Sequence, residues 1–212
     1  MRKSVWAAAI VVLGLGAAWV LSAPTDINHS DFDGLTGDAK AGEQVFWATG
    51  CSSCHAMDEK NPLVLAGGQA FPTEFGTFYA PNISPDPVHG IGGWTLAEFA
   101  RAIQKGVGKE GEHLYPALPY NAYNKMIPQD VANLKAYMDT LPASDQASKP
   151  HDVAFPFNIR RTLGFWKLLF VSDQFVIKGD LTPEQTRGRY LAEAMTHCGE
   201  CHTPRNELGG LT

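Results

Sequence analysis

Three stretches of the chain repeat apolar residues at the spacing of one helix face. Asp38 and Gly50 bracket the first stretch, and these residue types are suited to begin and to end a helix. Thr95 and Glu98 form a capping box at the second, and Pro128 opens the third. The apolar positions of the last two stretches are Leu96, Phe99, Ala100, Ile103 and Val107, then Val131, Leu134, Tyr137, Met138 and Leu141. The pattern predicts an all-α domain with three short helices over residues 37–145.

A segment from Gly67 to Trp94 breaks this helical pattern. It is rich in glycine and proline, which predicts a long, irregular, omega-like loop. Its aromatic residues are expected to pack on a cofactor, with packing on protein alone as the alternative. They are Phe71, Phe75, Phe78 and Tyr79.

The N-terminal segment is apolar and uncharged from Val5 to Ala23. Such a run is about long enough for one transmembrane helix, which takes roughly 20 residues. Arg2 and Lys3 precede the run, so the positive-inside rule places the body of the protein outside the cytoplasm. Residues 1–24 are therefore predicted to be a membrane anchor. A cleaved secretory signal is the alternative, although Pro24 after the cut site is unfavourable.

Composition narrows the class of protein. Hydrophobic residues make up 44% of the chain, as in a folded protein, and the net charge is -5 with no Lys/Arg block. Nucleic-acid binding is therefore disfavoured. The chain has four cysteines, and all of them fall in two short motifs, CSSCH and CGECH.

The two motifs share a histidine directly after the second cysteine. Two disulfides or a zinc site would use four cysteines, but neither accounts for the histidines. The pattern C-x-x-C-H is the attachment signature of c-type haem, because two thiols bond the porphyrin edge and the next imidazole ligates the iron. The sequence thus predicts two covalent haem c groups. Their attachment residues are Cys51, Cys54, Cys198 and Cys201, and their proximal ligands are His55 and His202.

A second domain is predicted to begin before the second motif. Thr182 and Gln185 form a capping box, with Pro183 in the first helical turn. Residues 182–212 are predicted to be the start of this domain, and residues 146–181 a linker. The apolar stretch Phe165–Phe170 in the linker is expected either to meet a membrane or partner, or to pack between the haem domains.

The sixth ligand of the first iron has several candidates. Met57 is too near the attachment site, and Met138 lies on an apolar helix face, which favours a core position. His89 and His113 lie in turns that are expected at the surface. Met126 lies in a loop just before a packed helix, from which a thioether can reach the iron, so Met126 is the predicted ligand, with a packing role as the alternative.

A family resemblance rests on four stretches, GEQVFWATGCSSCHA, FGTFYAPNISPDPVHGIGGWTLAEFARAIQKGV, HLYPALPY and CGECHTPRN. They resemble the membrane-anchored cytochrome c subunits of bacterial periplasmic alcohol, gluconate and aldehyde dehydrogenases. The resemblance implies tandem class I-type cytochrome c domains, and the family usually carries three haems, whereas this chain shows two attachment motifs. The second domain is expected to be incomplete, because nothing after His202 can supply a distal ligand or a closing helix. Many members carry Met at the position of Leu118, and this departure leaves Met126 as the nearby methionine.

The resemblance implies electron transfer from a periplasmic dehydrogenase subunit to ubiquinone or a terminal oxidase. The protein would be a single-pass inner-membrane protein with its haem domains in the periplasm, and a non-catalytic subunit. The rival is a dihaem enzyme, a peroxidase or a thiosulfate-oxidising cytochrome, with an open iron. A gas-binding sensor is a weaker rival. A chain truncated relative to its family is expected, unless the second haem is five-coordinate or borrows a ligand.

Overall fold

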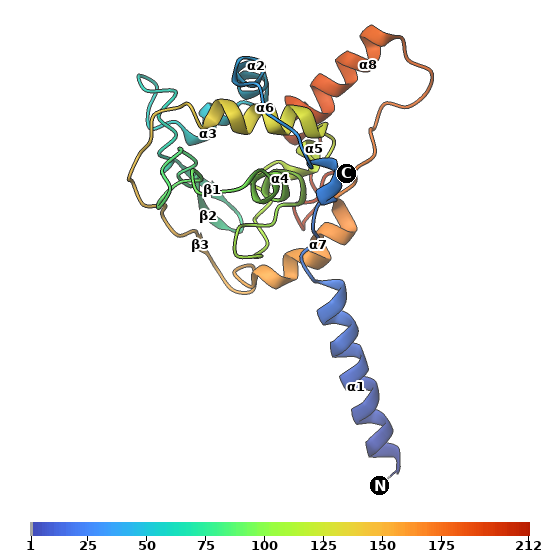
Figure 1. Cartoon of the computed structure of the whole chain (residues 1–212). Helices are drawn as coiled ribbons and strands as arrows, with labels where there is room; N and C mark the ends of the chain where they lie inside the picture. Colours follow the sequence, from blue (N-terminus) through green and yellow to red (C-terminus); the bar gives the residue numbers. More distant parts are fainter. Residues whose placement is uncertain (1) are drawn as a thin grey trace.

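The computed structural model describes residues 2–212, except for the side chains of Arg2 and Ser4. Helix α1 (Arg2–Leu21) stands away from a rounded body that contains the other elements (Figure 1). The body has the helices α2 (Ala39–Thr49), α3 (Cys51–His55), α4 (Leu96–Lys105), α5 (Tyr120–Tyr123), α6 (Pro128–Met138), α7 (Leu163–Phe170), α8 (Pro183–Tyr190) and α9 (Cys198–His202), the 3-10 turns η1 (His29–Asp31) and η2 (Arg160–Thr162), and the π-helical turn η3 (Leu191–Met195).

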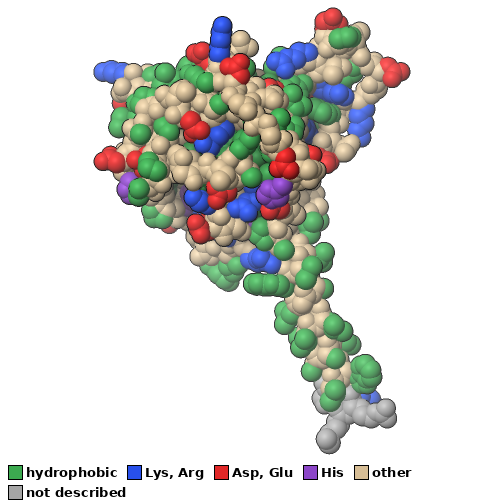
Figure 2. Space-filling model, in the orientation of Figure 1, with side chains coloured by type: hydrophobic (Ala, Val, Ile, Leu, Met, Phe, Trp, Pro, Cys, Tyr) green, Lys and Arg blue, Asp and Glu red, His purple; other side chains and the backbone are tan. Residues whose placement is uncertain are grey.

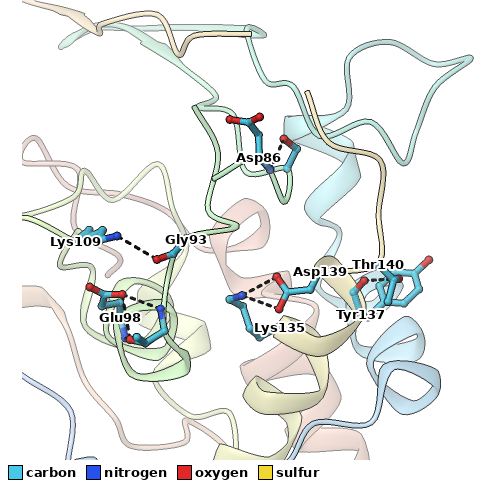
Figure 3. Close-up of polar contacts among 10 residues, drawn as sticks. Asp86, Gly93, Glu98, Lys109, Lys135, Tyr137, Asp139 and Thr140 are labelled. Carbon is cyan, nitrogen blue, oxygen red and sulfur yellow. Dashed lines mark hydrogen bonds and ion pairs between the residues drawn. The ribbon is translucent and has the colours of Figure 1, made fainter. Parts of the chain in front are cut away.

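The predicted helix ends are confirmed by their capping contacts. The Asp38 carboxylate accepts hydrogen bonds from two backbone amides at the start of α2, and Gly50 ends this helix in the left-handed region, at φ 66°. Thr95 and Glu98 make both bonds of the capping box of α4, and Figure 3 shows the Glu98 carboxylate at this helix start. The three predicted helices of residues 37–145 thus form where the sequence places them.

The crossing of α2 and α6 is the most extensive helix contact in the body. A Cβ atom on Gly42 would lie 1.9 Å from the backbone oxygen of Asn133, so only glycine allows this approach. One turn along α2, the rings of Phe46 and Tyr137 pack at 5.2 Å between centroids. At the end of α6, the buried Lys135 pairs with Asp139 at 2.6 Å (Figure 3). The crossing fixes the frame on which the first cysteine motif is held.

A small antiparallel sheet corrects the all-α prediction. Its strands are β1 (Ala70–Thr73), β2 (Gly76–Tyr79) and β3 (Asp152–Val153), in the order β1-β2-β3. The hairpin of β1 and β2 lies inside the segment that was expected to be irregular. The register pairs Ala70 with Tyr79 and Thr73 with Gly76, and Gly76 has φ 129°, which glycine adopts readily. The fold is mostly helical, with this one sheet at its side (Figure 1).

Two aromatic rings of the hairpin region contact protein side chains. Phe78 packs at 5.0 Å from the Tyr115 ring and 5.5 Å from the His151 ring. Phe75 packs at 4.9 Å from the Phe157 ring. These contacts favour the alternative interpretation, in which the aromatics pack on protein.

The segment that contains the second motif shares the core of the first domain. Ala194 and Met195 of η3 are buried within the large hydrophobic cluster of the body. The Tyr190 hydroxyl donates to the Asp130 carboxylate at 2.7 Å and accepts from the amide of Ile127 at 3.1 Å. These contacts join the segment to the first domain, and the division into two domains remains a prediction.

The segment of residues 146–181 is packed against the body through α7. The Lys167 amine donates to the backbone oxygens of Lys105 and Gly106, at 2.7 Å each, and so covers the end of α4. The Trp166 indole donates to the backbone oxygen of Leu208 at 2.8 Å. One predicted alternative for this segment, packing between the regions that carry the motifs, agrees with these contacts.

Helix α1 displays its apolar side chains to the outside along its length (Figure 2). At its base, Ser22 is buried, and its hydroxyl accepts a hydrogen bond from Arg161 at 2.9 Å. Within residues 2–212, no helix is long and apolar enough to cross a membrane.

Candidate haem-attachment sites

The first motif forms the short helix α3 directly after the left-handed Gly50. Cys51 and Cys54 lie one helical turn apart, and both thiols are free and half-buried. The Thr49 hydroxyl lies 3.3 Å from the Cys51 sulfur. Burial raises the pKa of the Cys51 thiol to about 11, so this thiol is protonated at neutral pH.

The histidine of the first motif is oriented by one backbone oxygen. His55 Nδ1 lies 2.8 Å from the carbonyl oxygen of Pro81, so Nδ1–H donates and Nε2 keeps its lone pair. Burial lowers the pKa of His55, and the imidazole is therefore neutral at neutral pH. A neutral imidazole whose other nitrogen is held by a carbonyl is the usual arrangement of a metal-ligating histidine. The residues of this site fit a covalently bound haem.

The second motif repeats the local arrangement of the first, but its cysteines and histidine are more exposed to solvent. Cys198 and Cys201 are free thiols on α9, and both are exposed, as is His202. The hydroxyl of Thr196, two residues before Cys198, lies 3.1 Å from its sulfur, as Thr49 does from the first cysteine of its motif. The repeated threonine was not predicted, although the T-x-C-x-x-C-H pattern that both sites share is visible in the sequence.

The four cysteines are unpaired, which speaks against the two-disulfide alternative. No group of three or more His, Cys, Asp or Glu side chains gathers as a metal site within residues 2–212. The zinc alternative therefore has no assembled ligand set in this part of the chain. The haem-attachment interpretation of both motifs stands.

The predicted sixth ligand, Met126, is 3% exposed. Its backbone oxygen accepts a hydrogen bond from the Gln104 amide at 2.8 Å, and the residue lines a cavity of about 210 Å³ together with Phe32 and Pro128. Ligation of the first iron by Met126 stays a prediction. Met138 is buried in the core, as predicted.

The other candidate ligands divide between surface and interior. His89 is exposed, as predicted, and Met57 is 49% exposed. The prediction for His113 is wrong, because this residue is 3% exposed and its Nε2 lies 2.9 Å from the backbone oxygen of Ser22. The charged turn before His113 folds back so that His113 forms a bridge with Val107, and this pairing carries its ring under the base of α1.

The two motifs meet in space although they lie far apart in the sequence. The ring of His197, the residue before Cys198, lies with Nε2 3.3 Å from the backbone oxygen of Thr49, two residues before Cys51. The Tyr123 hydroxyl donates to the same oxygen at 2.8 Å, and its ring packs edge-on against His197 at 5.7 Å. No local pattern predicts this junction, because it depends on how the body packs.

Comparisons with known proteins agree with this description. The cytochrome c family, described as "Cytochrome c", matches residues 39–142, and the helical fold over this range is that of cytochrome c. A protein of Cereibacter sphaeroides named "Diheme cytochrome c-type" is 54% identical, and the match covers 99% of this chain and 72% of that protein. The fructose dehydrogenase cytochrome subunit of Gluconobacter japonicus is 40% identical over 79% of this chain and 35% of its own length.

The gluconate 2-dehydrogenase cytochrome c subunit of Pantoea cypripedii is 39% identical over 79% of this chain and 38% of its own length. The chain thus spans little more than a third of the length of these dehydrogenase subunits. Since both attachment motifs and the capped helices are in place, the chain belongs to the cytochrome c family and has two attachment sites for covalently bound haem c.

Proposed function

We propose that the chain is the electron-transfer subunit of a bacterial periplasmic dehydrogenase and passes electrons towards ubiquinone or a terminal oxidase. The observation that carries this proposal is the pair of attachment motifs, each with two free thiols and a histidine, in contact through Thr49 and His197. Haem bound at such motifs supplies a one-electron iron couple.

The protein's own residues hold and orient the first attachment site. The Pro81 carbonyl fixes the ring of His55 and its tautomer, and a hydrogen bond of this kind makes the other ring nitrogen a better ligand. Half-burial of Cys51 and Cys54 limits water at this site, which is one of the means by which a protein tunes an iron couple.

The names of the relatives support a dehydrogenase as electron donor. Relatives named as cytochrome subunits act with fructose, gluconate and quinone-dependent alcohol dehydrogenases. The match to a dihaem cytochrome over nearly the whole chain supports two haems.

The experiment is a purification of the tagged chain with its native partners, followed by addition of alcohols, aldehydes and sugar acids under anaerobic conditions. We expect one substrate class to reduce both haems, seen as the sharpened absorption bands of ferrous haem c. Oxidation by added ubiquinone should then restore the ferric spectrum. Haems that no substrate reduces, together with turnover of hydrogen peroxide or thiosulfate, would support a dihaem enzyme instead.

We further propose that α1 attaches the protein to the inner membrane, with the body of the protein in the periplasm. The apolar side chains of α1 are exposed, and the guanidinium of Arg161 stacks 4.1 Å from the Trp19 ring at its base. Near this base, Leu168 and Leu169 of α7 are exposed as well. Membrane fractions washed with high salt should retain the chain. Its release as a soluble protein that begins near Pro24 would show a cleaved signal.

A further inference from the structure

We propose that His197 is a positioning residue that fixes the second attachment motif against the first, so that haems attached at the two motifs would be held close enough to exchange an electron. The inference rests on the proposed electron-transfer function. Haems bound at the two motifs would supply the one-electron couples, and the residues of the junction would only hold the two motifs in place.

The first support is the set of contacts that His197 makes. Its Nε2 lies 3.3 Å from the backbone oxygen of Thr49 and also close to Gly50, 4.0 Å from the position of a Cβ atom there. Its ring packs edge-on against Tyr123, whose hydroxyl donates to the same Thr49 oxygen. One imidazole thus joins the residue before the second motif to the two residues before the first.

The second support is the backbone of His197. Its φ is 43°, and within residues 2–212 it is the only non-glycine residue with positive φ. A left-handed residue with a bulky side chain is unfavourable and persists where its surroundings require it. The turn at His197 takes the chain from the buried Met195 to the exposed α9, whose first hydrogen bond runs from the Glu200 amide to the His197 oxygen at 2.9 Å.

The third support is the contrast in burial on the two sides of this turn. Ala194 and Met195 are locked in the core, whereas Cys198, Cys201 and His202 are exposed. His197 therefore makes a tertiary contact directly before α9, and the Trp166 indole holds the segment after α9 at the Leu208 oxygen, so the second motif is held on both sides. The other two residues of the junction are less suited to a test. Thr49 contributes a backbone atom, which a substitution does not remove, and Tyr123 is buried, so that its replacement would disturb the core.

The test uses the full chain with both haems attached and the variant His197→Gly. Glycine accepts the left-handed backbone but removes the imidazole, so the contact is tested without adding strain. The matched control is His89→Gly, which removes an exposed histidine from a turn. A variant His197→Ala serves as a second arm, because it removes the ring and keeps a Cβ atom.

Hydrogen exchange measures how firmly α9 is held. The amides of Glu200 and Thr203 are hydrogen-bonded within α9. We expect their protection to fall about 5- to 30-fold in His197→Gly, which corresponds to the loss of one hydrogen bond and one ring contact. The amides of α6 should keep their protection. The control His89→Gly should change neither set.

The spectroscopic readout is circular dichroism in the main haem absorption band, where two haems held close to each other in a fixed orientation give a two-signed signal. We expect this signal in the wild type and its loss in both His197 variants. The proposal is overturned if His197→Gly keeps the signal, or if it leaves the protection of α9 unchanged or higher. A wild type with the two-signed signal but no substrate-driven reduction would overturn the proposed function and leave the junction in place.

Discussion

The crossing of α2 and α6 makes a definite prediction about one added methyl group. In Gly42→Ala the new Cβ would lie 1.9 Å from the Asn133 oxygen, 2.6 Å from its carbonyl carbon and 2.8 Å from the Tyr137 Cβ. Two of these atoms are backbone, so the helices must move apart. Overpacking of this kind costs up to about 3 kcal/mol, and the better helix propensity of alanine returns about 1 kcal/mol, which leaves a net loss of about 2 kcal/mol.

The matched control is Gly188→Ala in α8. A Cβ atom on Gly188 meets nothing within 4 Å, so only the propensity gain of about 1 kcal/mol applies. At about 2–4 °C per kcal/mol for a chain of this size, Gly42→Ala should lower the Tm by about 4–8 °C and Gly188→Ala should raise it by about 2–4 °C. Far-UV circular dichroism of the haem-loaded protein measures both. A Gly42→Ala protein as stable as the wild type would refute the close crossing.

Three further predictions concern the haem sites and pH. The variant Met126→Ala should abolish the weak sulfur-to-iron absorption band of one oxidised haem, whereas Met138→Ala should keep the band and destabilise the core by about 2–5 kcal/mol; the opposite pattern would contradict the assignment of Met126. Replacing both Cys51 and Cys54 by Ala should leave one covalent haem by mass spectrometry instead of two, and an unchanged mass gain would contradict attachment there. Burial and a nearby guanidinium lower the pKa of His151 below its ordinary 6.5, and its Nδ1 accepts from a strand amide at 3.1 Å. Unfolding therefore takes up a proton below pH 6.5, so stability should fall as pH drops through 6.5, and His151→Gln should reduce this dependence in urea unfolding; an equal pH dependence in both proteins would contradict it.

The helices and their ends were predictable because short-range contacts determine them. The Asp38 carboxylate bonds amides two and three residues away, and the capping boxes of Thr95 and Thr182 close over three residues. The haem-attachment residues were predictable for the same reason, since thiols and imidazole must lie within one turn of helix. The cytochrome c family match to residues 39–142 agrees with this part of the prediction.

The hairpin and the burial of His113 were not predictable from local pattern. Strand β2 is completed by β3, which lies more than seventy residues later in the chain, as the pairing of Thr77 with Asp152 shows. His113 follows charged residues that predict a surface turn, yet its Nε2 lies 2.9 Å from the backbone oxygen of Ser22 at the base of α1. In both cases a partner distant in the sequence decides the structure, and a single sequence does not identify that partner.

The junction of the two motifs also depends on residues that are distant in the sequence, and it bears on function. Two CxxCH motifs predict two haems wherever they occur, but transfer between the haems depends on their relative position, which the motifs themselves do not determine. In this chain the relative position of the two motifs depends on the buried Met195, the left-handed His197 and the Thr49 oxygen that His197 contacts. Tyr123 of α5 donates a hydrogen bond to the same Thr49 oxygen. A change that moves this oxygen at the first site would therefore also affect the contact that positions the second motif. The contact between the residues that precede the motifs is thus the structural basis of our proposal that the two sites act as one electron-transfer unit.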